Sequence, residues 1–309
     1  MSRIHEALKK AAEERSAQVA ERNAPELIEL TSEELSGREP QAGKLVPPPV
    51  VGGLAKAAVT LKPYDEFVRR CQRPAWKMET RSSVFSPETK DLVGAEKFRT
   101  LRSRLHQIAA AQKLQKIVIT SSLPAEGKTF IAANLAQSFT RQADKKVLLI
   151  DADLRASRLN LMLGAPGKPG LSDYLRGDVE DFQVTQVGPD GNLCLIPGGR
   201  EVENPSELLH SERMKLLLDK MATLFDWVIL DSPPALAVHD ASILADMTDG
   251  VLFVVRAGAT NYQLAEKAAS EFAEKNLLGV VLNRAEKHDT YGGYYYGYAG
   301  EKAEEKGRV

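Results

Sequence analysis

Cysteine is scarce in this sequence of 309 residues, which contains Cys71 and Cys194 and no C-x-x-C spacing. Two distant cysteines argue against a disulfide framework or a zinc site and fit a reducing cytoplasm. The formal net charge is −1, so bulk charge does not favour nucleic acid as a partner. No apolar run approaches the ~18–20 residues that cross a bilayer, and the N-terminus lacks an apolar signal core. We therefore expect a cytoplasmic protein that reaches a membrane only through a partner.

The sequence also lacks the motifs of several common enzyme classes. It contains neither G-x-S-x-G nor H-E-x-x-H, which argues against an α/β-hydrolase nucleophile and a zinc protease site. Its five histidines are scattered along the chain, whereas a metal site needs its ligands brought together.

A phosphate-binding loop is predicted between residues 117 and 135. Ile117 to Thr120 reads as a buried strand, a short loop follows, and a helix is expected over residues 130–138. Between them lie Gly127, Lys128 and Thr129, as in G-x-x-x-x-G-K-[ST], although Ser122 replaces the first glycine. In such a loop Lys128 would reach the β- and γ-phosphates and the Thr129 hydroxyl would ligate Mg²⁺.

Strand and helix patterns alternate after this loop. Apolar strands are expected at 146–151, 193–196, 226–231, 250–255 and 279–282, with helices between them. This alternation predicts an α/β fold with a doubly wound, mostly parallel sheet of the P-loop NTPase type. Ligands bind such sheets at the carboxyl ends of the strands.

Three aspartates follow or end these strands. Asp231 ends a strand in the Walker B form and would hold Mg²⁺, while Asp151 and Asp153 follow another strand. These two would hold the metal or accept the proton of an attacking hydroxyl. For one aspartate alone, a strand-end cap is the commoner role; three downstream of a P-loop favour nucleotide chemistry.

The two ends of the chain differ from this domain. Residues 1–20 are a possible amphipathic helix, either solvated or used for docking, and 21–80 form a Pro/Gly-rich linker that we expect to be largely disordered. Residues 81–287 are assigned to the P-loop domain and 288–309 to a flexible tail. Five of the eight tyrosines lie in that tail: Tyr291, Tyr294, Tyr295, Tyr296 and Tyr298. Considered alone, the tail could be a sticky, disordered Gly/Tyr segment.

A helix expected from Thr89 onward carries Glu96, Arg99 and Arg102 at three-residue steps. This spacing places them on one arc of the helix. They are either an exposed face with ordinary ion pairs or part of a contact between subunits, and spacing alone leaves both open.

These motifs together resemble those of the bacterial tyrosine kinases (BY-kinases) of exopolysaccharide and capsule biosynthesis, of the type whose kinase domain is a separate cytoplasmic protein. The resemblance covers roughly residues 80–300. It rests on the P-loop, VLLIDADLR (147–155), VILDSPP (228–234), GLSDYLRG (170–177), NPSELL (204–209), GVVLN (279–283), the E-x-x-R-x-x-R helix and the tyrosine cluster.

The resemblance implies an ATP- and Mg²⁺-dependent tyrosine autokinase that regulates exopolysaccharide or capsule chain length or export. It implies catalytic roles for Lys128, Asp151, Asp153 and Asp231; nucleotide contacts from Ala125, Glu126, Gly127, Lys128, Thr129, Phe130, Arg155 and Asn283; and metal contacts from Thr129, Asp151 and Asp231. Neighbouring subunits of a ring-like homo-oligomer, supported by Glu96, Arg99 and Arg102, would phosphorylate the five tail tyrosines. The implied partners are a membrane polysaccharide co-polymerase that activates the kinase at the inner face of the membrane, and a protein tyrosine phosphatase.

Two other readings remain at this stage. The first is a ParA/MinD-like ATPase switch without kinase activity, but Ser122 and Leu123 occupy the positions where those proteins carry a lysine. The second is a scaffold with a decayed site, which the presence of Lys128 and the three aspartates disfavours. One departure from the family pattern is Ala125, where many members have glycine. Its methyl group restricts the backbone dihedral angles that the loop can adopt.

Overall fold

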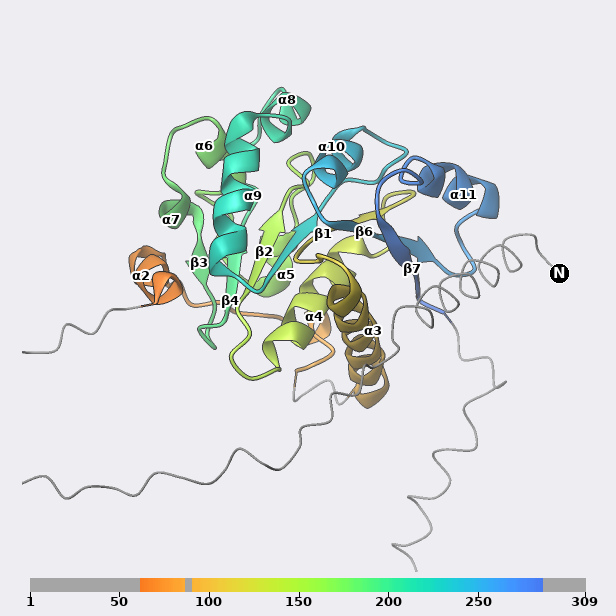
Figure 1. The fold of residues 1–309 in the computed structure, drawn as a ribbon, viewed down its shortest axis with the longest axis horizontal. Helices are drawn as coiled ribbons and strands as arrows, with labels where there is room; N and C mark the ends of the chain where they lie inside the picture. Colours follow the sequence, from red (N-terminus) through yellow and green to blue (C-terminus); the bar gives the residue numbers. More distant parts are fainter. Residues whose placement is uncertain (1–61, 87–90, 286–309) are drawn as a thin grey trace, which may run out of the picture. The chain divides into compact units, whose positions relative to one another are not determined.

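A seven-stranded sheet forms the centre of the computed structural model, which describes residues 62–86 and 91–285 (Figure 1). The strand order is β3-β4-β2-β5-β1-β6-β7. Their bounds are β1 Lys116–Ser121, β2 Val147–Asp151, β3 Gln186–Val187, β4 Leu193–Ile196, β5 Trp227–Asp231, β6 Gly250–Arg256 and β7 Leu277–Asn283. Every pairing is parallel except that of β3 with β4, so the predicted doubly wound, mostly parallel sheet is confirmed.

The strand β1 lies between β5 and β6. The chain runs outward from β1 in one direction through β2 and β4, then returns through β5 and continues to β6 and β7 on the other side. Ligands of such sheets bind where the strand order reverses, at the carboxyl ends of the strands. The P-loop follows β1, so it lies at this reversal.

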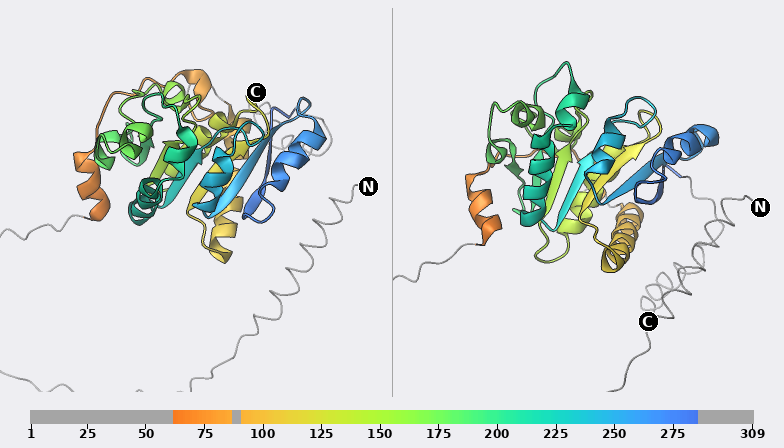
Figure 2. Two further views of the ribbon diagram at one scale, coloured as in Figure 1. Left: turned by 90° about the horizontal axis from the view of Figure 1, so that it is seen from above. Right: turned by 45° about the horizontal axis from the view of Figure 1, so that its top comes forward.

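Helices cover both faces of the twisted sheet (Figure 2). Alternate residues of β1 enter different cores: Ile117 and Ile119 pack with α3 and α4, whereas Val118 packs with α9 and α10. A strand with both faces buried must be apolar throughout, which is why β1, β2 and β5 read as continuous apolar runs. The bounds are α3 Leu92–Ala111, α4 Lys128–Thr140, α5 Leu159–Leu163, α6 Leu171–Leu175, α7 Asp181–Val184, α8 Pro205–Leu209, α9 Glu212–Leu224, α10 Asp240–Asp246 and α11 Tyr262–Ser270.

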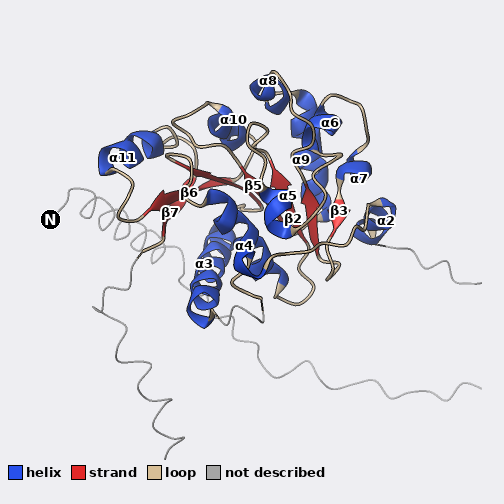
Figure 3. Ribbon diagram, turned by 180° about the vertical axis from the view of Figure 1, so that it is seen from behind, coloured by secondary structure: helices blue, strands red, loops and turns tan. Residues whose placement is uncertain are grey.

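The helices α3, α4 and α5 lie together on one side of the sheet (Figure 3). Asp91 caps α3 by accepting a hydrogen bond from the Gly94 N–H at 2.8 Å. The helix α4 begins at Lys128, two residues before the predicted start, because the helical backbone follows Gly127 directly. The helix α11 ends at Ser270.

The linker predicted over 21–80 is wrong for its last part, because residues 62–80 belong to the folded domain. The helix α2 (Pro63–Arg70) buries Tyr64, Phe67 and Val68, and the Tyr64 and Phe67 rings both meet the edge of the Phe225 ring. Burial of these apolar side chains offsets the entropy of ordering the segment. The proline-rich composition indicated a linker, but Pro63 occupies the first helical turn, where proline is well tolerated.

The predicted helix at 1–20 and the tyrosine tail from 288 lie outside the described residues. Within the described part of the chain, no helix has the length and apolar character that crossing a bilayer requires.

Candidate active site

The P-loop contains the left-handed backbone turn at Gly127 that a glycine allows. Gly127 has φ +97°, and a Cβ at this position would lie 2.0 Å from Nδ2 of Asn283. Only glycine therefore fits there without moving Asn283. Ala125 is left-handed as well, with φ +63°. Ala125 is thus a strained residue in the nucleotide loop.

The Glu126 side chain holds the P-loop in place through hydrogen bonds. Its side chain is buried and accepts hydrogen bonds from the Leu123 N–H at 2.7 Å and from the Thr260 hydroxyl. Its main-chain oxygen accepts from Nδ2 of Asn283 at 2.8 Å. Two of the eight residues predicted to contact nucleotide, Glu126 and Asn283, therefore connect the P-loop to the ends of β6 and β7.

A half-buried lysine and two buried carboxylates form the centre of the site. Nζ of Lys128 lies 2.9 Å from Oδ2 of Asp153 and 3.9 Å from Oδ1 of Asp231. These residues come from α4, from the loop after β2 and from the end of β5. Oδ1 of Asp231 is buried and accepts no hydrogen bond within the described residues, which leaves it open to another ligand.

The electrostatics of this centre depend on burial. Burial raises the pKa of Asp231 to about 7, and the nearby Lys128 only partly offsets this rise. Burial alone would lower the pKa of Lys128, but Asp231 and Asp153 outweigh it and raise that pKa. The lysine therefore stays charged, while Asp231 titrates near neutrality in the absence of a bound cation.

Asp151 has a different environment from the other two aspartates. Its Cα pairs in register with that of Asp231 on the neighbouring strand. Its carboxylate, however, accepts hydrogen bonds from the loop that follows its own strand. Oδ2 accepts from the Ser157 hydroxyl at 2.7 Å and from the main-chain N–H groups of Arg158 and Leu159, and Oδ1 accepts from that of Asp153. Burial raises its pKa. Asp151 shapes the loop that carries Asp153 and lies behind the cleft.

Arg155 extends from the same loop to the other side of the cleft. Its Nε lies 2.9 Å from Oδ2 of Asp240, and its Nη2 donates to the Ser206 hydroxyl at 2.8 Å. The hydrogen bond to Asp240 raises the pKa of Arg155. This network ties the loop after β2 to α8 and α10, so Arg155 reaches the cleft while anchored at its guanidinium.

A cleft of about 840 Å³ lies in front of the P-loop, within the ~300–1,000 Å³ range of small-molecule sites. Of the predicted nucleotide residues, it is lined by Ala125, Gly127, Lys128, Thr129, Phe130, Arg155 and Asn283, together with Asp153. Glu126, Asp151 and Asp231 are not among its lining residues. The sequence did not predict the other lining residues, which are Arg81, Pro124, Ala156, Arg158, Met162, Pro233, Pro234, Ala237, Val238 and Arg284. Of these, Pro233 and Pro234 carried a usable signal, since they directly follow the Walker B aspartate.

The residues fit Mg²⁺ and phosphate. The described residues contain no group of three or more His, Cys, Asp and Glu side chains that would hold a metal on its own. Mg²⁺ commonly binds one or two carboxylates and completes its shell with water and phosphate oxygens, and the free Oδ1 of Asp231 suits that role. The main-chain N–H groups of Glu126 and Gly127 donate to no acceptor in the described residues, so they remain free for phosphate oxygens.

The three residues predicted for subunit contact do not share one environment. Glu96 and Arg99 form an exposed ion pair at 2.8 Å. Arg102 instead donates to the main-chain oxygen of Ser138 in the last turn of α4, and burial lowers its pKa. Glu96 and Arg99 thus remain on the outer face of α3, whereas Arg102 joins α3 to α4.

Comparison with known proteins identifies the nucleotide-binding part of the chain. Residues 117–306 match the model of the CobQ/CobB/MinD/ParA nucleotide binding domain. The chain is 37% identical over 221 residues to the tyrosine-protein kinase YwqD of Bacillus subtilis, covering 70% of this chain and 92% of YwqD. It is also 37% identical over 209 residues to the tyrosine-protein kinase Wzc of Salmonella typhimurium, covering 66% of this chain but 29% of Wzc.

Solved structures agree with these relatives. The kinase domain of the Escherichia coli tyrosine kinase Etk superposes with a TM-score of 0.58 at 34% identity, covering 64% of this chain and 80% of that one. The chimerical protein CapA2B2 superposes with a TM-score of 0.63 at 30% identity, covering 72% of this chain and all of that one.

Proposed function

The chain belongs to the bacterial tyrosine-protein kinases, and we propose that it transfers the γ-phosphoryl group of ATP to tyrosines 291, 294, 295, 296 and 298 in the tails of neighbouring copies. The observation that carries the proposal is the position of Lys128, whose Nζ lies between Asp153 and Asp231 at the back of the cleft. A lysine between two carboxylates suits a site that holds both a phosphate and a metal ion, because the cation can contact phosphate oxygens and a carboxylate can bind the metal.

Each residue of the centre has a part in this reaction. Lys128 would exchange its contact with Asp153 for a phosphate oxygen, which leaves the Asp153 carboxylate free. Asp153 lines the cleft and would accept the proton of the attacking tyrosine hydroxyl. Asp231 and the Thr129 hydroxyl would hold Mg²⁺, which offsets the negative charge that phosphoryl transfer develops. Asp151 would act through the loop by positioning Asp153.

The wider role follows from the family. We propose that the chain acts at the inner face of the membrane through a polysaccharide co-polymerase partner and regulates the chain length or export of an exopolysaccharide or capsule. A protein tyrosine phosphatase would reverse the modification. The ring-like assembly would use the outer face of α3, where the Glu96–Arg99 pair is exposed.

The test is phosphopeptide mapping of the full chain after incubation with Mg-ATP. We expect phosphotyrosine in residues 291–298, and we expect Lys128→Met and Asp153→Asn to abolish it. Lys267→Ala, which removes an exposed cation of α11 away from the cleft, supplies the control and should leave phosphorylation unchanged.

The competing function is an ATPase switch of the ParA/MinD kind. ATP hydrolysis by the wild-type chain with no phosphotyrosine by mass spectrometry, with and without a peptide from a candidate membrane activator, would favour that function over the kinase.

A further inference from the structure

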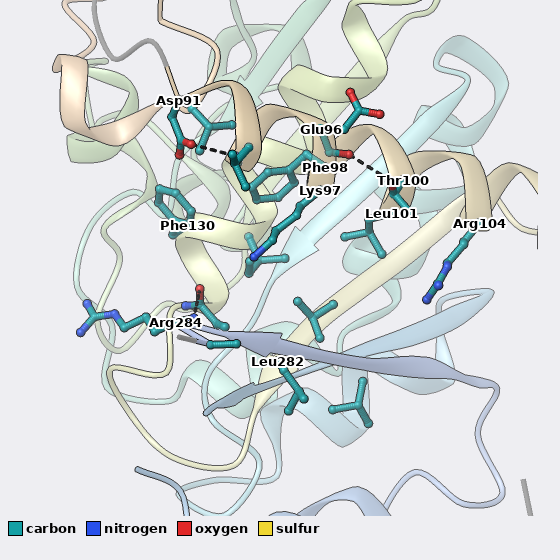
Figure 4. A pocket seen from close by; sticks show the side chains of 18 residues that line it. Asp91, Glu96, Lys97, Phe98, Thr100, Leu101, Arg104, Phe130, Leu282 and Arg284 are labelled. Atoms are coloured by element: carbon teal, nitrogen blue, oxygen red, sulfur yellow. Dashed lines mark hydrogen bonds between the residues drawn. The ribbon is translucent and has the colours of Figure 1, made fainter. Parts of the chain in front are cut away.

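A second cavity lies between α3 and the edge strand β7 (Figure 4). It adjoins the cleft, because Phe130, Asn283 and Arg284 line both. Its volume is about 590 Å³. We call it the α3–β7 groove and define it by its apolar lining residues Val93, Phe98, Leu101, Phe130, Val280 and Leu282. Leu282 and Val280 are 63% and 53% exposed. Apolar side chains gathered in an exposed groove indicate a binding surface.

Two cations reach into this groove from α3. Figure 4 shows the side chains of Lys97 and Arg104 extending from the helix toward β7. Neither has an ion-pair partner among the described residues, because Glu96, the nearest acid on the helix, is paired with Arg99. The seven residues that separate Lys97 from Arg104 correspond to a rise of about 10 Å along the helix.

The lining combines apolar walls, the two unpaired cations and two carboxylates. Both carboxylates are engaged, because Asp91 accepts from the Gly94 N–H and Glu96 pairs with Arg99. An aromatic ring would pack against Leu101 and Leu282, and an anion on that ring would meet Lys97 or Arg104. Phosphotyrosine combines both features in one side chain, because it carries about −1.5 to −2 charges at neutral pH on a ring. Unmodified tyrosine supplies only the ring.

The end of the described chain points to the source of that side chain. Ala285 is the last described residue before the tail, and it lines the groove beside Arg284. Tyr291 follows six residues later, a distance that an extended chain spans in about 20 Å. A segment tethered this close has an effective concentration in the millimolar range. Both cations are therefore within reach of the tail of the same chain.

We propose that the α3–β7 groove binds the phosphorylated tyrosine tail of its own chain, with phosphotyrosine on the apolar floor and its phosphate at Lys97 or Arg104. The proposal rests on the proposed function, since the kinase would supply the phosphotyrosine. It adds a product-binding site outside the cleft.

The first test measures binding without relying on kinase activity. A fluorescent peptide of residues 286–300 with phosphotyrosine at 291 is titrated with the full-length Lys128→Met chain, and anisotropy gives its affinity. We expect the Lys97→Ala/Arg104→Ala double variant to bind at least about tenfold more weakly, as loss of charge-assisted hydrogen bonds implies. Lys267→Ala/Arg69→Ala, which removes two exposed cations outside the groove, should bind as tightly as the parent chain.

Peptide controls decide what the groove recognises. Equal affinity for the unphosphorylated peptide would assign the groove to an apolar segment and overturn the proposal. Equal affinity for a scrambled phosphopeptide, or an undiminished affinity in the Lys97/Arg104 variant, would overturn it as well. Leu282→Ser changes an exposed apolar residue and tests the apolar floor without depending on charge, with weaker phosphopeptide binding expected.

The second test asks whether the tail docks on its own chain. Phosphotyrosine is incorporated at position 291 during synthesis of the full-length Lys128→Met chain, and hydrogen exchange is followed in α3 and β7. We expect slower exchange than in the unmodified chain, to the same extent at low and high protein concentration. Protection that appears only at high concentration would mean docking on a neighbour and would contradict the proposal. If the wild-type chain makes no phosphotyrosine, the kinase assignment fails while this binding result stands.

Discussion

At the scale of single residues, the backbone of Ala125 is the clearest source of strain in the site. Its φ of +63° places it in the left-handed region, which costs a residue with a Cβ roughly 1–2 kcal/mol. We expect Ala125→Gly to raise the free energy of unfolding by up to about 1 kcal/mol, measured by urea denaturation, without weakening ATP binding.

The matched control for this substitution is Ala156→Gly. Ala156 also lines the cleft but is not among the described residues with positive φ, so glycine there should destabilise the protein by raising the conformational entropy of the unfolded chain. If Ala125→Gly destabilises as much as Ala156→Gly, the strain assigned to Ala125 is wrong.

The buried carboxylate of Asp231 makes stability depend on pH in the absence of Mg²⁺ and nucleotide. Its pKa rises from 3.8 to about 7 because burial disfavours the charged form. The folded state therefore binds this proton more tightly than the unfolded state. The resulting stability is fully present below pH 3.8 and is lost as the pH rises through about 7.

Asp231→Asn removes this titration. We expect the variant to be stabilised relative to wild type at pH 8 and to lose less stability between pH 5 and pH 8, measured by urea denaturation in EDTA. Asp190→Asn, at an exposed position, should follow the wild-type profile. Parallel profiles for Asp231→Asn and wild type would contradict the assignment.

At the scale of elements, adjacent turns of α3 make two different kinds of contact. Arg102 joins the helix to α4 through the Ser138 carbonyl, while Arg99 forms an exposed pair with Glu96. A hydrogen bond from a charged donor contributes about 1.5–3 kcal/mol, whereas an exposed ion pair contributes about 0–1 kcal/mol.

This division predicts different results for two similar substitutions. Arg102→Ala should lower the melting temperature by several degrees, while Arg99→Ala should leave it nearly unchanged. If α3 supports the ring, Arg99→Ala should reduce the oligomer's mass in light scattering at constant stability. Equal melting temperatures for the two variants would show that Arg102 does not hold α3 to α4.

At the scale of the whole molecule, the proposed reaction needs two chains. One supplies the cleft and the other supplies a tail that begins after β7. A Lys128→Met chain with an intact tail is mixed with an active chain whose five tail tyrosines are replaced by phenylalanine. We expect phosphotyrosine on the Lys128→Met chain, at a rate that rises with protein concentration. Phosphorylation confined to chains that carry both an intact cleft and an intact tail would indicate transfer within one chain.

The sequence by itself determined the sheet, the P-loop and the placement of three aspartates. These features depend on neighbours in the chain: continuous apolar runs make buried strands, and Gly127 allows the turn before α4. Parallel strands end at one edge of the sheet, so strand-end aspartates had to meet there. The strongest predictions were therefore those in which local pattern and topology agree.

Only the tertiary structure decided what each side chain faces. Asp151 and Asp153 are two residues apart, yet one holds the loop and the other lines the cleft. Glu126 bonds Thr260, which is 134 residues away, and α2 is stabilised by the Phe225 ring. No local pattern contains such partners, because burial and hydrogen bonding depend on segments that meet only after folding.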